Sequence, residues 1–208
     1  IQFHGCGTGA PFGEAETRAA MICRLICFAR GYSGVSMELM HKMASLLNAG
    51  ITPVVPSEGS VGASGDLTPM SYVAAVLAGQ REVFFRGRQM PAKEALAEAG
   101  IAPHRFYPKE PLALMNGTAM MTGVGILAWD WARKLADAAV KATALCIHAI
   151  CGNTHHYHPV ISRAKPHPGQ ASAAAQIADL LASEIPVEQF SATGPETLQD
   201  PYCVRCAP

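Results

Sequence analysis

The chain has 208 residues, of which 50% are hydrophobic and 15% are charged, and its 16 basic and 16 acidic residues give a formal net charge of zero. A neutral chain has no excess positive charge for nucleic acid or for an anionic membrane surface, so we expect neither as a partner. The apolar composition predicts that missing chain or other subunits cover part of its surface.

The two ends read as internal positions of a longer chain. The sequence begins with Ile1 and stops at Pro208, so we expect a piece truncated at both ends, and no signal peptide opens it. The longest apolar stretches carry Asp, Arg or Lys within a few turns, which argues against a membrane-spanning helix. Seven cysteines without a regular framework are expected as reduced thiols, which is typical of a cytoplasmic protein.

Two helices are predicted before residue 51. The first ends at Gly31 and has one apolar face. That face consists of Ile22, Leu25, Ile26 and Ala29. The second begins near Ser36, a good N-cap, and ends at Gly50.

Residues 51–66 interrupt the helical pattern. They hold two prolines and three glycines and can form neither a long helix nor a central strand. Helix resumes over 67–78, with Pro69 tolerated in the first turn. Residues 82–90 predict a small hairpin, and residues 91–99 a short helix closed by a glycine.

The longest predicted helix runs from about 118 to about 150, roughly 50 Å at 1.5 Å per residue. Apolar residues surround it, so we expect it at the centre of a bundle. Another helix is predicted over 170–183, and residues 184–208 look irregular. With no repeat or linker, the chain is predicted to be one all-α domain piece built as a long-helix bundle.

The most informative segment is GSVGASGDLTP at positions 59–69. Its small residues allow a tight bend in which the Gly65 nitrogen approaches the carbonyl carbon of Ala63. Attack closes a five-membered ring, loss of water gives an imidazolone, and loss of the Ser64 hydroxyl as water leaves a methylidene. Asp66 is placed to orient the backbone or to move protons during closure. The alternative is a Gly-rich loop that merely ends a helix.

This segment resembles the signature of the aromatic amino acid ammonia-lyase and aminomutase family. Two more strings match the family in order, LMNGT at 114–118 and QDPYCVRC at 199–206. ARGYSG at 29–34 and KPHPGQ at 165–170 are weaker matches. Three ordered matches are specific. The resemblance implies the long-helix bundle of the ammonia-lyase (fumarase/aspartase-like) fold, with residues 1–208 as the central part of the catalytic domain.

The resemblance also implies a prosthetic group and its chemistry. Family members form 4-methylidene-imidazol-5-one (MIO) autocatalytically from Ala-Ser-Gly, here Ala63, Ser64 and Gly65, and need no external cofactor or metal. The MIO is an electrophile that makes the substrate amine a better leaving group. The expected products are ammonia and an α,β-unsaturated acid from histidine, phenylalanine or tyrosine. Alternatives are a 2,3-aminomutase that makes a β-amino acid and a non-catalytic truncated subunit kept for assembly.

Four polar residues take roles by resemblance. Asn116 is expected beside the ring, and its alternative role is a helix-breaking Asn-Gly step. Arg205 is expected to clamp the substrate carboxylate in two places, the alternative being a surface arginine. Tyr202 and Gln199 match residues near the MIO, and both have ordinary packing or capping as alternatives.

The catalytic base has no counterpart in this chain. In the family, a tyrosine on a mobile loop N-terminal to the matching region removes the β-proton, and further pocket residues come from the C-terminal half. Each active site is shared among the subunits of a homotetramer. We therefore expect that the chain is not competent alone and that Tyr202 and Arg205 serve a neighbour's MIO.

The residues that read the aromatic ring match Phe3 and His4. The histidine coincides with one found in histidine ammonia-lyases. Phe3 resembles phenylalanine ammonia-lyases, although those carry leucine where this chain has His4. The pair is mixed: His4 suits an imidazole or a phenolic hydroxyl, and Phe3 a flat apolar ring. A merely solvated histidine is the alternative.

Other motifs predict no separate site. The histidines at 155, 156 and 158 lack the spacing of zinc ligands, so we expect a structural or surface cluster. The CVRC string at 203–206 has redox spacing without the strand-then-helix context of a thioredoxin-like site. The glycines at 5, 7 and 9 lack the lysine of a phosphate loop.

Overall fold

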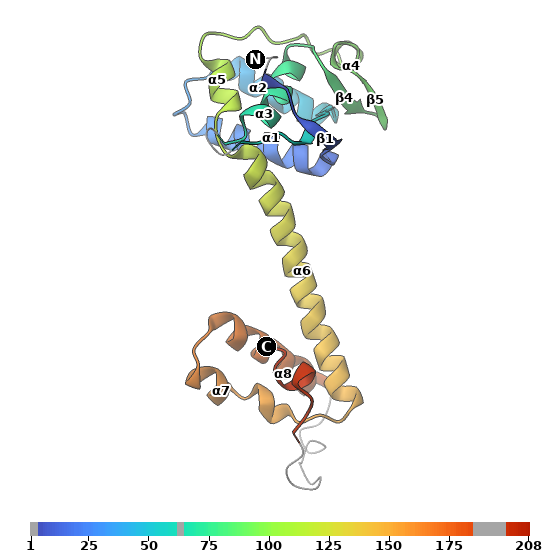
Figure 1. Cartoon of the computed structure of the whole chain (residues 1–208), viewed down its shortest axis with the longest axis vertical. Coiled ribbons are helices and arrows are strands. Elements are labelled where there is room, and N and C mark those ends of the chain that lie inside the picture. The colour runs from blue at the N-terminus through green and yellow to red at the C-terminus, as the bar shows by residue number, and fades with distance from the viewer. Residues whose placement is uncertain (1–3, 62–64, 185–198) are drawn as a thin grey trace. The chain divides into compact units, whose positions relative to one another are not determined.

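The computed structural model describes residues 4–61, 65–184 and 199–208, and Figure 1 shows their elements. Most of these residues are helical. They divide into two compact units, with the boundary between Trp129 and Asp130. The prediction of a single domain piece over residues 1–208 stays a prediction.

The first unit contains five complete helices, the start of a sixth, and two small sheets. The helices are α1 (Glu14–Ala29), α2 (Met37–Ala49), α3 (Leu67–Leu77), α4 (Ala92–Glu98), α5 (Glu110–Met115) and α6 (Ala119–Ala149). One sheet pairs β1 (Thr8–Pro11) with β3 (Pro56–Glu58), and the other has the order β2 (Thr52–Pro53), β4 (Glu82–Phe85), β5 (Arg88–Pro91). All these pairings are antiparallel.

Helix α2 confirms its predicted boundaries. The Ser36 hydroxyl accepts a hydrogen bond from the Leu39 amide at 3.2 Å, and Gly50 ends the helix at φ 71°. A serine cap satisfies an amide that has no partner within the helix, and glycine adopts the left-handed conformation without a Cβ penalty. Leu39, Met43 and Leu46 are fully buried.

Helix α1 turns a different face inward from the predicted one. Ile22 and Ile26 are 46% and 57% exposed. The buried residues are Thr17, Ala20, Met21, Arg24 and Phe28. A Cβ on Gly123 of α6 would lie 2.5 Å from the Ala20 nitrogen, so two small residues let the helices approach closely. The contact with α6 therefore buries a face of α1 other than the apolar face that the spacing predicted.

The segment after α2 contains only short strands, as predicted for a stretch rich in proline and glycine. Helix α3 follows it, and every residue from Thr68 to Leu77 is buried. The predicted hairpin is confirmed: Phe85 pairs with Arg88. Arg86 and Gly87 form its two-residue turn at φ 52° and 72°, the backbone signs of a type I′ turn.

The second unit has a small core of its own. Its elements are the end of α6, a 3₁₀ turn η2 (Thr154–Tyr157), α7 (Pro159–Ala164), α8 (Pro168–Glu184) and α9 (Tyr202–Arg205). The core residues are Ala144, Ile147, Tyr157, Ala174, Ile177, Leu181 and Val204. The predicted helix over 170–183 is confirmed. The prediction of an irregular tail missed α9, a single turn that packs through Val204.

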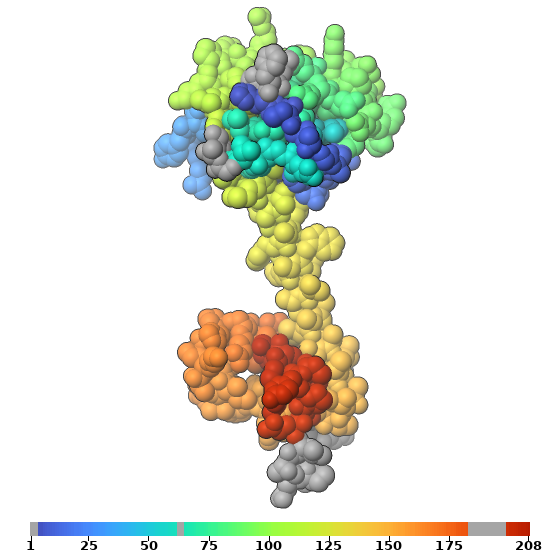
Figure 2. All heavy atoms as spheres, in the orientation of Figure 1, coloured from blue at the N-terminus to red at the C-terminus, as the bar shows by residue number. Residues whose placement is uncertain are grey.

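Helix α6 confirms the predicted long helix, at 31 residues. Of the apolar residues expected inside a bundle, Ile147 is fully buried, but Trp131 and Leu135 are both 72% exposed and Leu145 is 70% exposed in the described part of the chain. Figure 2 shows the side chains of α6 (yellow) standing out from the helix. Within the described residues, no helix has the length and hydropathy needed to cross a membrane.

Candidate active site

Gly65, the last residue of the Ala-Ser-Gly triad, lies directly against Gly117. The two form a parallel β-bridge, and the Asp66 amide donates to the Gly117 carbonyl at 2.8 Å. Gly65 has φ +68°, and a Cβ on it would overlap that carbonyl oxygen. Only glycine fits this approach. Ala63 and Ser64, the other predicted members of the triad, lie outside the described residues.

Asp66 is buried, with 4% of its surface exposed. One carboxylate oxygen accepts from the Met121 amide at 2.9 Å and the other from the Ser60 hydroxyl at 3.1 Å. Met121 lies in the first turn of α6, so Asp66 caps a helix that begins 53 residues later in the chain. The N-terminus of that helix favours a negative charge at this position. Asp66 therefore fixes the backbone beside the triad to α6.

Asn116 ends α5 immediately before Gly117. Its backbone amide and its side-chain amide nitrogen both donate to the Leu112 carbonyl, at 2.9 and 3.1 Å. The side chain is half-buried, whereas the two residues before it, Leu114 and Met115, are buried in the core. The structure thus brings together Gly65, Asp66 and Asn116, three of the predicted site residues, through the bridge to Gly117.

The segment after His4 lies beside the loop that leads to the triad. The Gly7 amide donates to the Tyr72 hydroxyl at 3.2 Å, and β1 pairs with β3. A Cβ on Gly59 would lie 2.9 Å from the Gly7 Cα. His4 itself is exposed. Phe3, its predicted partner in reading the ring, lies outside the described residues.

The remaining predicted residues belong to the second unit. The guanidinium of Arg205 donates to the Gln199 side-chain oxygen and lies over the Tyr202 ring, 4.3 Å from its centre. Tyr202 is 73% exposed. These three side chains therefore form one cluster on α9 and the two residues before Pro201, with the arginine oriented by the other two.

A buried tyrosine fixes α9. The Tyr157 hydroxyl donates to the Val204 carbonyl at 2.5 Å. Burial, together with the charges of Asp200 and Cys206, raises the pKa of Tyr157 to about 12. Asp200 also accepts from the Asn153 amide at 2.7 Å. The neutral phenol of Tyr157 thus fixes the turn that carries Arg205.

The histidine cluster takes part in the same arrangement. His156 lies 3.2 Å from the Asp200 carboxylate through its Nε2, and His158 caps α7 by accepting from the Val160 amide at 3.2 Å. Across the described ranges, no group of three His, Cys, Asp or Glu side chains is arranged to hold a metal ion. Both histidines therefore have structural contacts.

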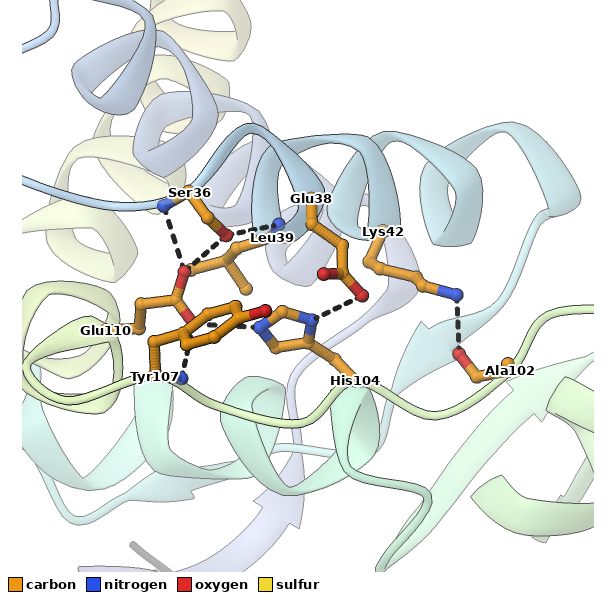
Figure 3. A network of polar contacts seen from close by, with 8 residues as sticks. All are labelled: Ser36, Glu38, Leu39, Lys42, Ala102, His104, Tyr107 and Glu110. Carbon is orange, nitrogen blue, oxygen red and sulfur yellow. Dashed lines mark hydrogen bonds and ion pairs between the residues drawn. The ribbon is translucent and has the colours of Figure 1, made fainter.

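Sequence reasoning missed a network around Glu110, at the start of α5 (Figure 3). One oxygen accepts from the Ser36 amide at 2.9 Å and from its hydroxyl at 2.5 Å. The other accepts from the Tyr107 amide and from His104 Nε2, both at 2.9 Å. Burial alone would raise the pKa of Glu110, but the hydrogen bonds outweigh it and lower the pKa to about 2. This ionised carboxylate anchors the short helix that ends at Asn116.

Arg24 was also missed. It occupies the buried face of α1, and its guanidinium contacts Gly117. The available signal was a lone charged residue among apolar ones, between Met21 and Phe28, which by itself names no function. Buried arginines are rare without a partner.

The comparison with known families decides the assignment. A model described as aromatic amino acid lyase matches residues 1–208. The chain belongs to this family. Its most similar relatives include histidine ammonia-lyases from Myxococcus xanthus, 42% identical over all 208 residues, and Sorangium cellulosum, 41% identical over the same span. The chain covers 41% and 40% of those two proteins, so this aromatic lyase chain spans about two fifths of their length.

Solved structures of the family agree with the fold. Histidine ammonia-lyase from Trypanosoma cruzi gives a TM-score of 0.85 at 30% identity, over 99% of this chain and 37% of that one. Phenylalanine ammonia-lyase from Rhodosporidium toruloides gives 0.87 at 30% identity, over 99% and 34%. Phenylalanine aminomutase from Pantoea agglomerans gives 0.84 at 32% identity, over 98% and 42%. The predicted family and the mainly helical ammonia-lyase fold are confirmed.

Proposed function

We propose that the full-length protein is a MIO-dependent lyase that eliminates ammonia from an aromatic L-amino acid, with histidine as the first substrate to test. Histidine is chosen because relatives 42% and 41% identical are named histidine ammonia-lyases and because His4 coincides with a histidine of that group. In this proposal residues 1–208 are the central part of the catalytic domain of a cytoplasmic homotetramer with shared active sites.

The observation that carries the proposal is the close approach of Gly65 to Gly117. Ring closure needs an unhindered nitrogen in a tightly bent backbone, and the positive φ of Gly65 with no room for a Cβ supplies both. Asp66, the residue after Gly65, is fixed in place because its carboxylate accepts hydrogen bonds from Met121 and Ser60. The residues present therefore fit a MIO group at positions 63–65. Such a group supplies an electrophilic carbon that turns the substrate amine into a better leaving group.

The chain's own residues bind and orient the substrate around that position. Asn116 offers an amide beside Gly117 that holds the amine or polarises the ring. Arg205 grips the substrate carboxylate, which fixes the Cα–Cβ bond for elimination. Its contacts with Gln199 and Tyr202 hold the guanidinium in one orientation for that task, which we assign to a neighbouring subunit's MIO.

The decisive experiment uses the full-length protein. Its intact mass should lie two water molecules below the mass calculated from the sequence. Incubation with histidine, phenylalanine and tyrosine in separate reactions, followed by near-ultraviolet absorbance, should show an unsaturated acid from one of them. An unmodified mass would refute the electrophile and favour the non-catalytic subunit. A modified protein inactive on all three amino acids would refute the substrate class.

A 2,3-aminomutase is the second candidate, and a specific finding favours it. Solved structures at 32% and 34% identity are those of a phenylalanine aminomutase and a tyrosine aminomutase. A mutase uses the same residues but retains ammonia and returns it to Cβ, so retention depends on how tightly the site closes. Product analysis separates the two, because a β-amino acid identifies the mutase and an unsaturated acid with free ammonia identifies the lyase.

A further inference from the structure

Arg24 is a charged residue in the middle of an apolar helix face. Its neighbours along the buried side of α1 are Ala20 and Met21, one turn before it, and Phe28, one turn after it. Only 6% of Arg24 is exposed. Its guanidinium lies 5.9 Å from the centre of the Phe28 ring. The side chain therefore points into the unit, away from solvent.

The group that Arg24 reaches is Gly117. A Cβ built on Gly117 would overlap Nη2 of Arg24 and lie 2.8 Å from its Nη1 and 3.0 Å from its Cζ. Gly117 also carries the carbonyl that a Cβ on Gly65 would overlap. Three layers thus lie in contact without an intervening side chain: the Gly65 backbone, the Gly117 backbone and the guanidinium. Moving the guanidinium moves Gly117, and moving Gly117 moves Gly65.

Packing stability does not explain an arginine here. Burial lowers the pKa of Arg24, and the charges of Cys27 and Asp66 only partly offset this. Nε and Nη2 are buried and have no hydrogen-bond acceptor among the described residues. An unpaired buried donor is unfavourable, and an apolar side chain of similar length would avoid that penalty. Such a group in a folded protein calls for another explanation.

We propose that Arg24 is a positioning residue for formation of the MIO group: its guanidinium packs against Gly117 and thereby holds the Gly65 nitrogen in place for ring closure. This inference rests on the proposed function. In closure, the bond from the Gly65 nitrogen to the Ala63 carbonyl carbon forms. The carbonyl oxygen leaves as water with the amide hydrogens of Gly65 and Ser64, and the Ser64 hydroxyl leaves as a second water with the Cα hydrogen. Arg24 exchanges no atom with these groups.

The charge of Arg24 adds to its support of the backbone. Asp66 accepts hydrogen bonds from a serine and a backbone amide, and its charge opposes the lowering of the pKa of Arg24 by burial. A cation nearby stabilises the buried carboxylate of Asp66, the residue after Gly65. Lysine at position 24 would keep the charge but lose the planar surface on which Gly117 lies.

The test follows ring closure in the full-length protein made by cell-free synthesis. Intact mass is recorded over time for the wild type, Arg24→Met, Arg24→Lys and the control Arg30→Met. Arg30 is an exposed arginine at the C-cap of the same helix, so its replacement removes an equal charge. We expect Arg24→Met to close on the order of a hundredfold more slowly, the effect of an about 1 Å misplacement. Arg24→Lys should be intermediate, and Arg30→Met should match the wild type.

A second measurement separates positioning from general damage. The unfolding temperature of Arg24→Met should show a folded protein, so that slow closure in this variant is not a consequence of lost folding. Closure of Arg24→Met at the wild-type rate would overturn the inference. If Arg24→Met does not fold, Arg24→Lys decides in the same way. Failure of the wild type and Arg30→Met to lose water would overturn the proposed function itself, and this inference with it.

Discussion

Replacing Glu110 with glutamine removes the charge of a buried carboxylate but keeps its shape. Four hydrogen bonds end on that carboxylate, from the Ser36 amide and hydroxyl, the Tyr107 amide and His104. The glutamine oxygen can still accept some of them, but its nitrogen brings two donors to a place where donors already converge. The charge therefore dominates the loss.

The magnitude follows from the pKa. The pKa of Glu110 is lowered from 4.5 to about 2, and at 1.36 kcal/mol per unit the ionised form contributes about 3 kcal/mol to the stability of the folded state. Because the folded pKa is the lower one, this contribution is complete above pH 4.5 and disappears as the pH falls through about 2. At pH 7 the variant should lose all of it.

Hydrogen exchange measured by mass spectrometry on the full-length protein reads this loss locally. Protection of the Ser36 and Tyr107 amides should fall about a hundredfold in Glu110→Gln at pH 7. The control is Glu38→Gln, which removes an exposed carboxylate 3.7 Å from His104 and should change protection less than about fivefold.

Two results would refute the reasoning. The first is equal loss of protection in Glu110→Gln and Glu38→Gln, which would mean that the buried charge contributes nothing beyond a surface pair. The second is a difference from the wild type that persists undiminished at pH 3, below the pH range in which the contribution is complete.

Four further substitutions test the site. Ser64→Ala should abolish ammonia release without lowering the unfolding temperature, and substantial turnover would contradict the mechanism. Gly117→Ala places a Cβ against Arg24 and should lower the yield of closed protein by intact mass more than tenfold, at an about 3 kcal/mol packing penalty. Arg205→Ala should raise KM and lower kcat together, and unchanged kinetics would place Arg205 outside the site. Tyr157→Phe loses one buried hydrogen bond and should destabilise the second unit by about 1 to 2 kcal/mol in urea unfolding.

Local signals predicted much of the fold. The Ser36 cap and Gly50 set the limits of α2, and Gly87 set the hairpin turn, because these residues satisfy requirements of the backbone within a few positions of themselves. The length of α6 was likewise readable from its uninterrupted helical pattern. In each case the deciding interaction is close in sequence.

Sequence reasoning failed for features that depend on contacts with residues distant in the sequence. The spacing of Ile22 and Ile26 predicted one apolar face of α1, but the close approach of Gly123 of α6 to Ala20 buries a different face. Helix α5 has six residues, too few to be stable alone. It forms because Glu110 is bonded to residues up to 74 positions away, and no local pattern announces that.

The candidate site divides in the same way. The GSVGASGDLTP string pointed to Gly65 and Asp66, and LMNGT pointed to Asn116, but neither string contains the contact between Gly65 and Gly117. Arg24 belongs to none of the matched motifs, so its role could be inferred only from its contact with Gly117 in the structure. The roles assigned to His4, Gln199, Tyr202 and Arg205 stay predictions.

The crossing of Gly7 and Gly59 has a consequence for anyone who wishes to change substrate preference. The backbone at Gly7 presses on the loop that leads to the triad, with no side chain to absorb a displacement. A bulkier residue at position 4 that shifts the segment as far as Gly7 would therefore also deform the electrophile-forming loop. Libraries at positions 3 and 4 should be screened for prosthetic-group content before activity. A variant can be inactive because its triad has not cyclised, even when its substrate pocket is suitable.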